Sequence, residues 1–228
     1  MKEYNQETYN NTDIPLEYGK IFNDINFETQ KNKGVSDREI SLISKRGYFL
    51  TRLAANHNVS NIIEVGTAAG WQFYSFCHYI NTELFGKGNI WSCDVRDYRD
   101  SNYINKYPEI SNFVEGDSRK MSKLIPDNFK CDLFFIDGNH DRGAVVEDIN
   151  NLKKFQSENP IWVFDDYDQR FGIYEEIKNI ESSKENYNKL IGNGCYIFKK
   201  NTHLTNEWYK QLMLLMDNKY DNLKKYPS

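Results

Sequence analysis

Long apolar segments are absent from this sequence, as are several other signatures of particular protein classes. No stretch approaches the roughly 20 apolar residues that cross a bilayer, and the N-terminal MKEYNQETYNN lacks the apolar run of a signal peptide. The four cysteines form no C-x-x-C pair, so we interpret them as small buried hydrophobes in a reducing compartment. We therefore expect a cytoplasmic protein without a membrane partner.

An excess of charge of one sign is missing as well. The chain has 29 basic and 33 acidic residues, a formal net charge of -4, and no basic stripe. Because binding to a nucleic-acid backbone depends on clustered Lys and Arg, we expect no nucleic-acid partner.

The sequence does contain enough apolar material for one sizeable core. Its 228 residues are 39% hydrophobic and 15% aromatic, which suits one folded domain with short appendages. We expect that domain over residues 38–200 and a polar arm or lid with at most short helices over residues 1–37. A helical extension is expected over residues 201–228, and its apolar stripe could serve core packing or a homo-oligomer surface.

Short apolar runs alternate with segments of helical periodicity from residue 36 onward. Strands are predicted at 61–65, 89–94, 112–116, 131–137 and 161–166, and further helices near 69–85, 99–107, 118–124, 141–156 and 170–182. Strands that are each followed by a helical or loop crossover predict an α/β fold with a doubly wound, mostly parallel sheet. A G-N-G turn at 192–194 between two apolar runs predicts a closing C-terminal antiparallel hairpin.

Acidic residues stand at or just beyond the ends of all five predicted strands. They are Glu64, Asp94, Asp117, Asp137 and the pair Asp165–Asp166. In open α/β sheets, ligands bind outside the carboxyl ends of the strands, where the strand order reverses. Some of these acids could instead cap the next helix, and Asp117 is a candidate for that role. Capping explains a set at five successive strand ends poorly, whereas a cationic ligand with hydroxyl groups would suit it.

The loop after the first strand, E-V-G-T-A-A-G-W at 64–71, is built of small residues that let the backbone approach a ligand. Its two glycines, Gly66 and Gly70, could equally make a tight strand-to-helix turn. Asp94 is placed to accept hydrogen bonds from ribose hydroxyls, as in sites for NAD or for S-adenosylmethionine. A dinucleotide needs the full G-x-G-x-x-G for its pyrophosphate and no crowd of carboxylates. S-adenosylmethionine carries a sulfonium, an ammonium and no phosphate, so the acids favour it.

Together, E-V-G-T-A-A-G, the strand-end Asp94, G-D-S at 116–118 and F-I-D-G-N-H at 135–140 resemble class I methyltransferases, which have a Rossmann-like fold. The likeness is nearest to small-molecule O-methyltransferases of the catechol and macrolide-sugar types, over roughly residues 38–200. Two departures are Ala68, where many relatives carry glycine, and E-N-P at 158–160, where they carry a proline-glycine-glycine turn.

This resemblance implies a set of cofactor contacts. The residues concerned are Glu64, Gly66, Gly70, Asp94, Asp117, Ser118 and Asp137. By the likeness, the first three shape the methionine pocket, the fourth holds the ribose and the next two face the adenine. The last would reach the cofactor amine.

Asp137, Asp165 and Asp166 form a second constellation at the ends of the fourth and fifth strands. Neighbouring strands lie about 4.8 Å apart, so these carboxylates can converge on one point. Three hard oxygen ligands that leave open positions suit Mg²⁺. The alternative is that the Asp pair caps the next helix. In the resembling metal-dependent enzymes, a strand-four aspartate and a strand-five acidic pair hold the ion, and an acid at Asp166 is closer to the sugar-modifying branch.

His140 lies three residues beyond Asp137, at the expected opening of the next helix. A helix N-terminus disfavours the imidazolium, so a neutral ring there could accept a proton from a substrate hydroxyl. In the resembling sugar methyltransferases, a histidine at this offset is the proposed base. The alternative is a surface histidine in a local turn contact.

The sequence thus predicts an enzyme that transfers a methyl group from S-adenosylmethionine to a hydroxyl of a small molecule. A sugar or sugar-bearing metabolite is favoured over a catechol, with Mg²⁺ assistance and His140 as general base. Three alternatives stay open: a metal-independent N- or protein methyltransferase, an NAD-linked oxidoreductase, and a non-catalytic module that binds the cofactor. The acceptor cannot be read from the sequence, because loops shape its pocket.

Overall fold

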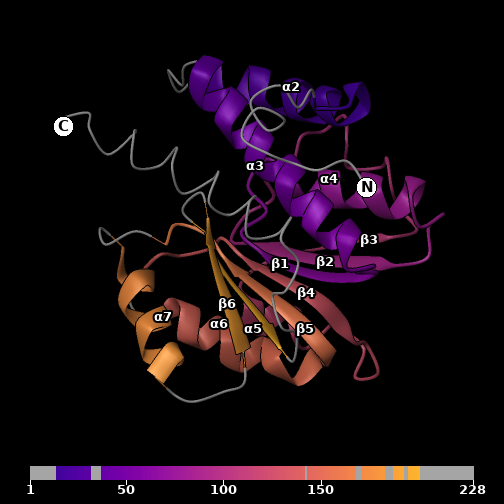
Figure 1. Cartoon of the computed structure of the whole chain (residues 1–228). Coiled ribbons are helices and arrows are strands. Elements are labelled where there is room, and N and C mark those ends of the chain that lie inside the picture. Colours follow the sequence, from indigo (N-terminus) through magenta and orange to yellow (C-terminus); the bar gives the residue numbers. More distant parts are fainter. Residues whose placement is uncertain are drawn as a thin grey trace.

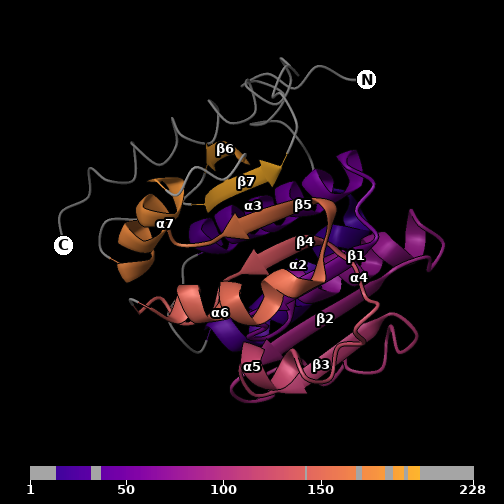
Figure 2. The same cartoon turned by 90° about the horizontal axis from the view of Figure 1, so that it is seen from below.

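One sheet organises the computed structural model, which describes residues 14–31, 37–141, 143–167, 171–182, 187–192 and 195–200. Within these residues the sheet has seven strands in the order β3-β2-β1-β4-β5-β7-β6 (Figures 1 and 2). The strands are β1 (Asn61–Val65), β2 (Asn89–Asp94), β3 (Ser111–Glu115), β4 (Cys131–Ile136), β5 (Gln156–Phe164), β6 (Tyr187–Gly192) and β7 (Cys195–Lys200).

The first five strands are parallel, which confirms the predicted doubly wound α/β sheet. The chain moves outward from β1 to β2 and β3, then returns to place β4 on the other side of β1. The strand order therefore reverses between β1 and β4, where open α/β sheets bind their ligands. β7 pairs antiparallel with β5, and β6 with β7. Residues 193–194, which carry the predicted hairpin turn, lie outside the described residues, so the hairpin stays a prediction.

Helices cover both faces of the sheet (Figure 1). One face carries α2 (Leu16–Lys31), α3 (Asp37–Asn56) and α4 (Trp71–Thr82), and the other carries α5 (Ser118–Met121), α6 (Ala144–Leu152) and α7 (Gly172–Ser182). A short 3₁₀ turn, η1 (Lys153–Phe155), connects α6 to β5.

The central strands are apolar on both faces because both faces are covered. Successive residues of a strand point to opposite faces. Ile62 and Leu133 therefore belong to the core beneath α2–α4, while their neighbours Ile63 and Phe134 belong to the core beneath α5–α7.

The N-terminal segment departs from its prediction. Where at most short helices were expected, α2 is a helix of 16 residues. Tyr18, Ile21, Phe22 and Ile25 are buried in the same core as α3 and α4. These four residues have the i, i+3, i+4, i+7 spacing of an apolar helical stripe, but polar residues and Gly19 surround them. Tertiary burial of this narrow stripe explains why a polar segment forms a helix.

The predicted helix at 99–107 is wrong. Residues 101–110 form turns, closed by bonds such as Tyr103 N–H to Asp100 C=O (2.9 Å). The Asp100 carboxylate also accepts the Asn102 N–H at 2.9 Å, a local bond that competes with helix formation. Tyr103 and Tyr107 are nevertheless buried, so the apolar spacing reflects packing without a helix.

Other boundaries shift by a few residues. α5 ends at Met121 instead of 124, α6 begins at Ala144, and β5 begins at Gln156, where its register with β4 is irregular. The predicted helical extension at 201–228 lies outside the described residues. Among the residues that are described, no helix is long and apolar enough to span a membrane.

Candidate active site

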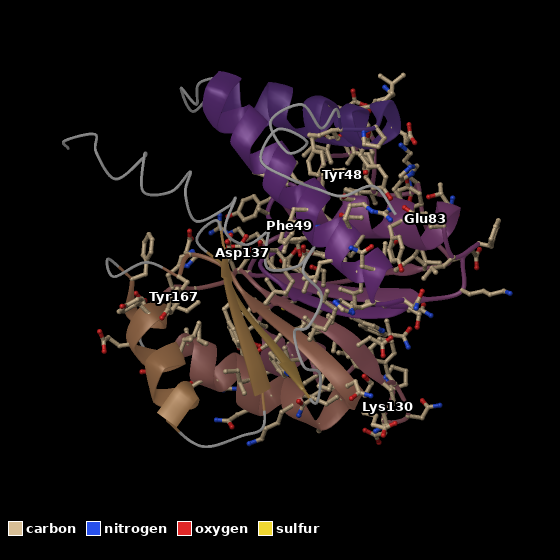
Figure 3. The ribbon with its side chains drawn as sticks, viewed as in Figure 1. Tyr48, Phe49, Glu83, Lys130, Asp137 and Tyr167 are labelled. Carbon is tan, nitrogen blue, oxygen red and sulfur yellow. The ribbon has the colours of Figure 1, made fainter. Side chains whose placement is uncertain are left out.

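The carboxyl ends of the central strands meet at one edge of the sheet. Backbone bonds extend the parallel ladders past the strand ends: Gly66 N–H to Cys93 C=O (2.9 Å), Asp137 N–H to Val65 C=O (2.8 Å) and Asp165 N–H to Ile136 C=O (2.9 Å). The loops that follow β1, β4 and β5 therefore lie side by side. In Figure 3, Asp137 marks this edge and Lys130 marks the opposite edge of the sheet.

Gly66 allows the loops after β1 and β4 to touch. Its φ is +92°, and a Cβ at this position would lie 1.9 Å from the carbonyl oxygen of Asp137. No side chain fits there, so this glycine serves the turn and the contact between loops. Ala68 also has a left-handed φ of 46°, a conformation that glycine adopts more easily. Contacts of Gly66 and Gly70 with a cofactor stay predictions.

Glu64 is a buried acid below this loop, with 1% of its surface exposed. Ser92 Oγ donates to Glu64 Oε2 at 2.5 Å, and Thr67 Oγ1 lies 2.5 Å from Ser92 Oγ. The pKa of Glu64 is raised to about 8, mainly by burial and also by the nearby Asp94, while the hydrogen bond from Ser92 lowers it. A cation bound beside this carboxyl would favour its ionised form.

Asp94 lies at the end of β2, facing the loop after β1. Its Oδ2 accepts the Ala68 N–H at 2.7 Å, so the carboxylate is fixed relative to that loop. This hydrogen bond thus connects the loop after β1 to the predicted ribose-binding acid.

The residues predicted to face the adenine have structural partners. Asp117 is the N-cap of α5, and its Oδ1 accepts the Lys120 N–H at 2.8 Å. Ser118 is only 2% exposed, and its Oγ accepts a hydrogen bond from Asn151 Nδ2 at 2.9 Å. The capping role considered for Asp117 is therefore confirmed, and an adenine contact stays a prediction for both residues.

One unsatisfied donor also lies beside the loop. The indole Nε1 of Trp71, the first residue of α4, is buried and has no hydrogen-bond partner among the described residues. A buried N–H without a partner is costly, so a polar group of a bound ligand would relieve it. Glu64 and Asp94 supply acceptors for cationic and hydroxyl groups, so the acids at these strand ends fit a cofactor such as S-adenosylmethionine.

Asp137, His140 and Asp166 converge beside the β4 and β5 ends. One potential ligand atom from each lies within 4.8 Å of the others, and all three are partly exposed. His140 Nε2 lies 3.2 Å from Asp166 Oδ2. Asp166 has a left-handed φ of 50°, so the chain turns sharply at this residue. Two carboxylates and an imidazole are suitable donors for a divalent cation.

Asp165 and His140 differ from their predicted settings. Asp165 is 2% exposed and is not part of the converging group, so its role as a metal ligand stays a prediction. The expectation that His140 opens the next helix is wrong, because α6 begins at Ala144 after Gly143, whose φ is +93°. A carboxylate, and not a helix terminus, is the neighbour that orients the ring.

Aromatic side chains lie next to this group. The rings of His140 and Phe171 have centroids 5.2 Å apart, and those of Tyr167 and Tyr174 are 4.8 Å apart. Tyr167, labelled in Figure 3, follows Asp166 directly in the chain. These rings could form an apolar wall for an acceptor.

Comparisons with known proteins point in one direction. Residues 63–167 match a family model described as a methyltransferase domain. No curated protein is significantly similar in sequence. An O-methyltransferase from Bacillus cereus, solved with SAH, is 13% identical and has a TM-score of 0.62, covering 86% of this chain and 95% of its own.

Two further solved structures are similar. The O-methyltransferase TomG from Streptomyces achromogenes, involved in tomaymycin synthesis and solved with SAM, is 13% identical with a TM-score of 0.60, covering 84% of this chain and 92% of its own. An SAH-bound methyltransferase from Podospora anserina is 15% identical with a TM-score of 0.57, covering 89% and 99%. The family match covers residues 63–167, and the solved structures show that the chain shares the fold of these methyltransferases.

Proposed function

We propose that this enzyme methylates a hydroxyl of a small molecule, with a divalent cation, Mg²⁺ by expectation, and His140 as general base. The convergence of Asp137, His140 and Asp166 at the cofactor edge carries this proposal. O-Methyltransferases among the similar structures support transfer to oxygen. An acid at Asp166 supports a sugar or sugar-bearing acceptor over a catechol, by the resemblance seen in the sequence.

Each residue has a role in the proposed reaction. Glu64 and Asp94 would hold the cofactor, and Asp137 and Asp166 would hold the cation. A divalent cation, when bound, lowers the pKa of a hydroxyl next to it. With Nε2 of His140 facing Asp166, Nδ1 is the nitrogen that takes the hydroxyl proton. S-adenosylmethionine, when bound, would supply the methyl group: the acceptor oxygen would bond to the methyl carbon, and the electron pair of the broken carbon–sulfur bond would stay on sulfur.

The protein also supplies proximity. Gly66 brings the loop after β1 against the Asp137 backbone. The loop proposed to bind the cofactor and the residue proposed to bind the cation therefore follow neighbouring strands. Holding donor and acceptor in line lowers the activation barrier, by up to about 7–11 kcal/mol when the reactants are well oriented.

Two variants test the role of the cation and the role of the base separately. We expect Asp166→Ala to lose Mn²⁺ binding in calorimetry and to lose metal-dependent transfer of labelled methyl into a metabolite extract. Asp141→Ala, at an exposed acid of the loop after β4, is the control and should behave like the parent.

His140→Ala should keep Mn²⁺ and S-adenosylhomocysteine but reduce transfer by roughly 10²–10⁴-fold, the usual contribution of a general base. The defect should shrink at high pH, where hydroxide can replace the imidazole. Loss of Mn²⁺ from His140→Ala would make the histidine a ligand instead of the base. Transfer that persists in EDTA, with Asp166→Ala fully active, would favour the metal-independent alternative.

A further inference from the structure

A buried carboxylate lies behind the candidate active site and is not used in the mechanism above. Asp148, on α6, is only 9% exposed. Its pKa is raised to about 6, mainly by burial and also by the nearby Asp117 and Glu147, while a hydrogen bond from Ser118 lowers it. A carboxylate that is buried at such a cost needs compensating contacts.

Its main partner is Ser118, which stabilises the ionised Asp148 by a hydrogen bond. A hydroxyl has one proton to donate, so Ser118 donates to Asp148 and accepts from Asn151 Nδ2, also on α6, at 2.9 Å. Ser118 is 2% exposed. The Ser118 side chain is therefore committed to α6, and Ser118 can offer a ligand only its backbone.

The same carboxylate also lies close to the loop after β4. A Cβ on Gly138 would be 3.8 Å from Asp148 Oδ2, and Gly138 follows Asp137 in the chain. Asp148 thus stands between the loop after β3, which carries Asp117, and the loop after β4, which carries Asp137 and His140.

We infer that Asp148 is a positioning residue for the cofactor, because it fastens the loop after β3 to α6 through Ser118. The loop backbone at residues 117–118 then has a fixed position beside the loop after β4. The adenosine end of S-adenosylmethionine would be held by that pair of loops. The inference rests on the proposed use of S-adenosylmethionine and not on the cation, the base or the acceptor.

Calorimetric titration with S-adenosylhomocysteine tests this inference, since it requires neither metal nor acceptor. Asp148→Ala should weaken binding about tenfold or more, as expected for the loss of a hydrogen bond to a charged group. Asp148→Asn keeps an acceptor oxygen and should stay within about threefold of the parent. Glu147→Ala is the matched control, because it removes an exposed α5–α6 link to Arg119 (3.3 Å) and should leave the affinity unchanged.

Ser118→Ala gives a second route if Asp148→Ala does not fold. It should weaken binding to a similar extent, and the double variant with Asp148→Asn should be no weaker than Ser118→Ala alone. Three results would overturn the inference: Asp148→Ala that melts earlier yet binds like the parent, Asp148→Asn that is as weak as Asp148→Ala, or Ser118→Ala that binds like the parent. A failed metal mechanism would leave all these affinities unaffected.

Discussion

The acids at the strand ends divide into two kinds when they are considered one residue at a time. Asp117 caps α5 through the Lys120 N–H, and Glu64 is buried against Ser92. Asp94, Asp137 and Asp166 are partly exposed at the site edge. The strand-end pattern predicted where these acids lie, but not how each is used, because use depends on burial and on backbone direction.

Asp94→Ala should weaken the binding of S-adenosylhomocysteine and leave the affinity for Mn²⁺ unchanged, because Asp94 ends β2, away from Asp137 and Asp166. Loss of charge-assisted bonds to the ribose should cost about 1.5–3 kcal/mol, measured by calorimetry. Unchanged cofactor affinity would remove Asp94 from the site.

Two features of the site were not visible in the sequence. Asp166 adopts a left-handed φ, which the sequence Asp165–Asp166 does not predict. Asp148 is buried because α6 packs against Ser118, a contact between segments 30 residues apart. Local patterns report periodicity and strand ends, whereas these features depend on tertiary packing.

At the scale of elements, the apolar strands were the most predictable part of the fold. NIIEV and CDLFFI are short apolar runs that suit strands covered on both faces. Two predictions were wrong: residues 16–31 form a longer helix than expected, and residues 99–107 do not form the expected helix. A polar segment formed a helix because its narrow stripe is buried, and an apolar spacing formed turns because Asp100 bonds locally.

The integration of α2 into the core can be measured directly. Ile21→Ala should lower the free energy of unfolding by about 2–5 kcal/mol, because Ile21 is 1% exposed. Leu16→Ala, at a site 85% exposed at the start of the same helix, should change it by less than about 0.5 kcal/mol. Denaturant titration compares the two, and equal small effects would indicate that α2 is a detachable lid.

The contact between the loops after β1 and β4 gives another element-scale prediction. Gly66→Ala should cost about 1–3 kcal/mol more than Gly143→Ala, because overpacking adds to backbone strain. The φ values of the two glycines are +92° and +93°, so the strain is matched, but a Cβ at Gly143 meets nothing within 4 Å. Thermal unfolding measures the difference. Equal losses would mean that the loops can separate freely.

For the molecule as a whole, the buried acids make stability depend on pH. The pKa of Glu64 is about 8 in the folded state, against 4.5 when unperturbed. The folded protein therefore holds a proton that the unfolded chain releases, so this contribution is complete below about pH 4.5 and is lost as the pH rises toward about 8. The pKa of Asp148 is about 6 in the folded state, against 3.8 when unperturbed. Its contribution to stability is therefore also lost as the pH rises, but over a lower pH range.

The melting temperature of the cofactor-free protein should consequently fall between about pH 5 and about pH 8. Glu64→Gln should flatten this slope, since glutamine does not ionise and can still accept from Ser92. Glu147→Gln, at an exposed acid, should keep the parent slope. Parallel curves for the parent and Glu64→Gln would show that Glu64 does not titrate in this range.

The proposed reaction places the methyl group of S-adenosylmethionine on a hydroxyl, with help from Asp137, His140 and Asp166. The most direct test incubates the protein with methyl-labelled S-adenosylmethionine, Mg²⁺ and a metabolite extract, and identifies labelled products by mass spectrometry. We expect a labelled methyl ether, on a sugar-bearing compound by preference, that disappears with EDTA and with Asp166→Ala. Label found only on nitrogen, or no label from a protein that still binds S-adenosylhomocysteine, would overturn the proposed reaction.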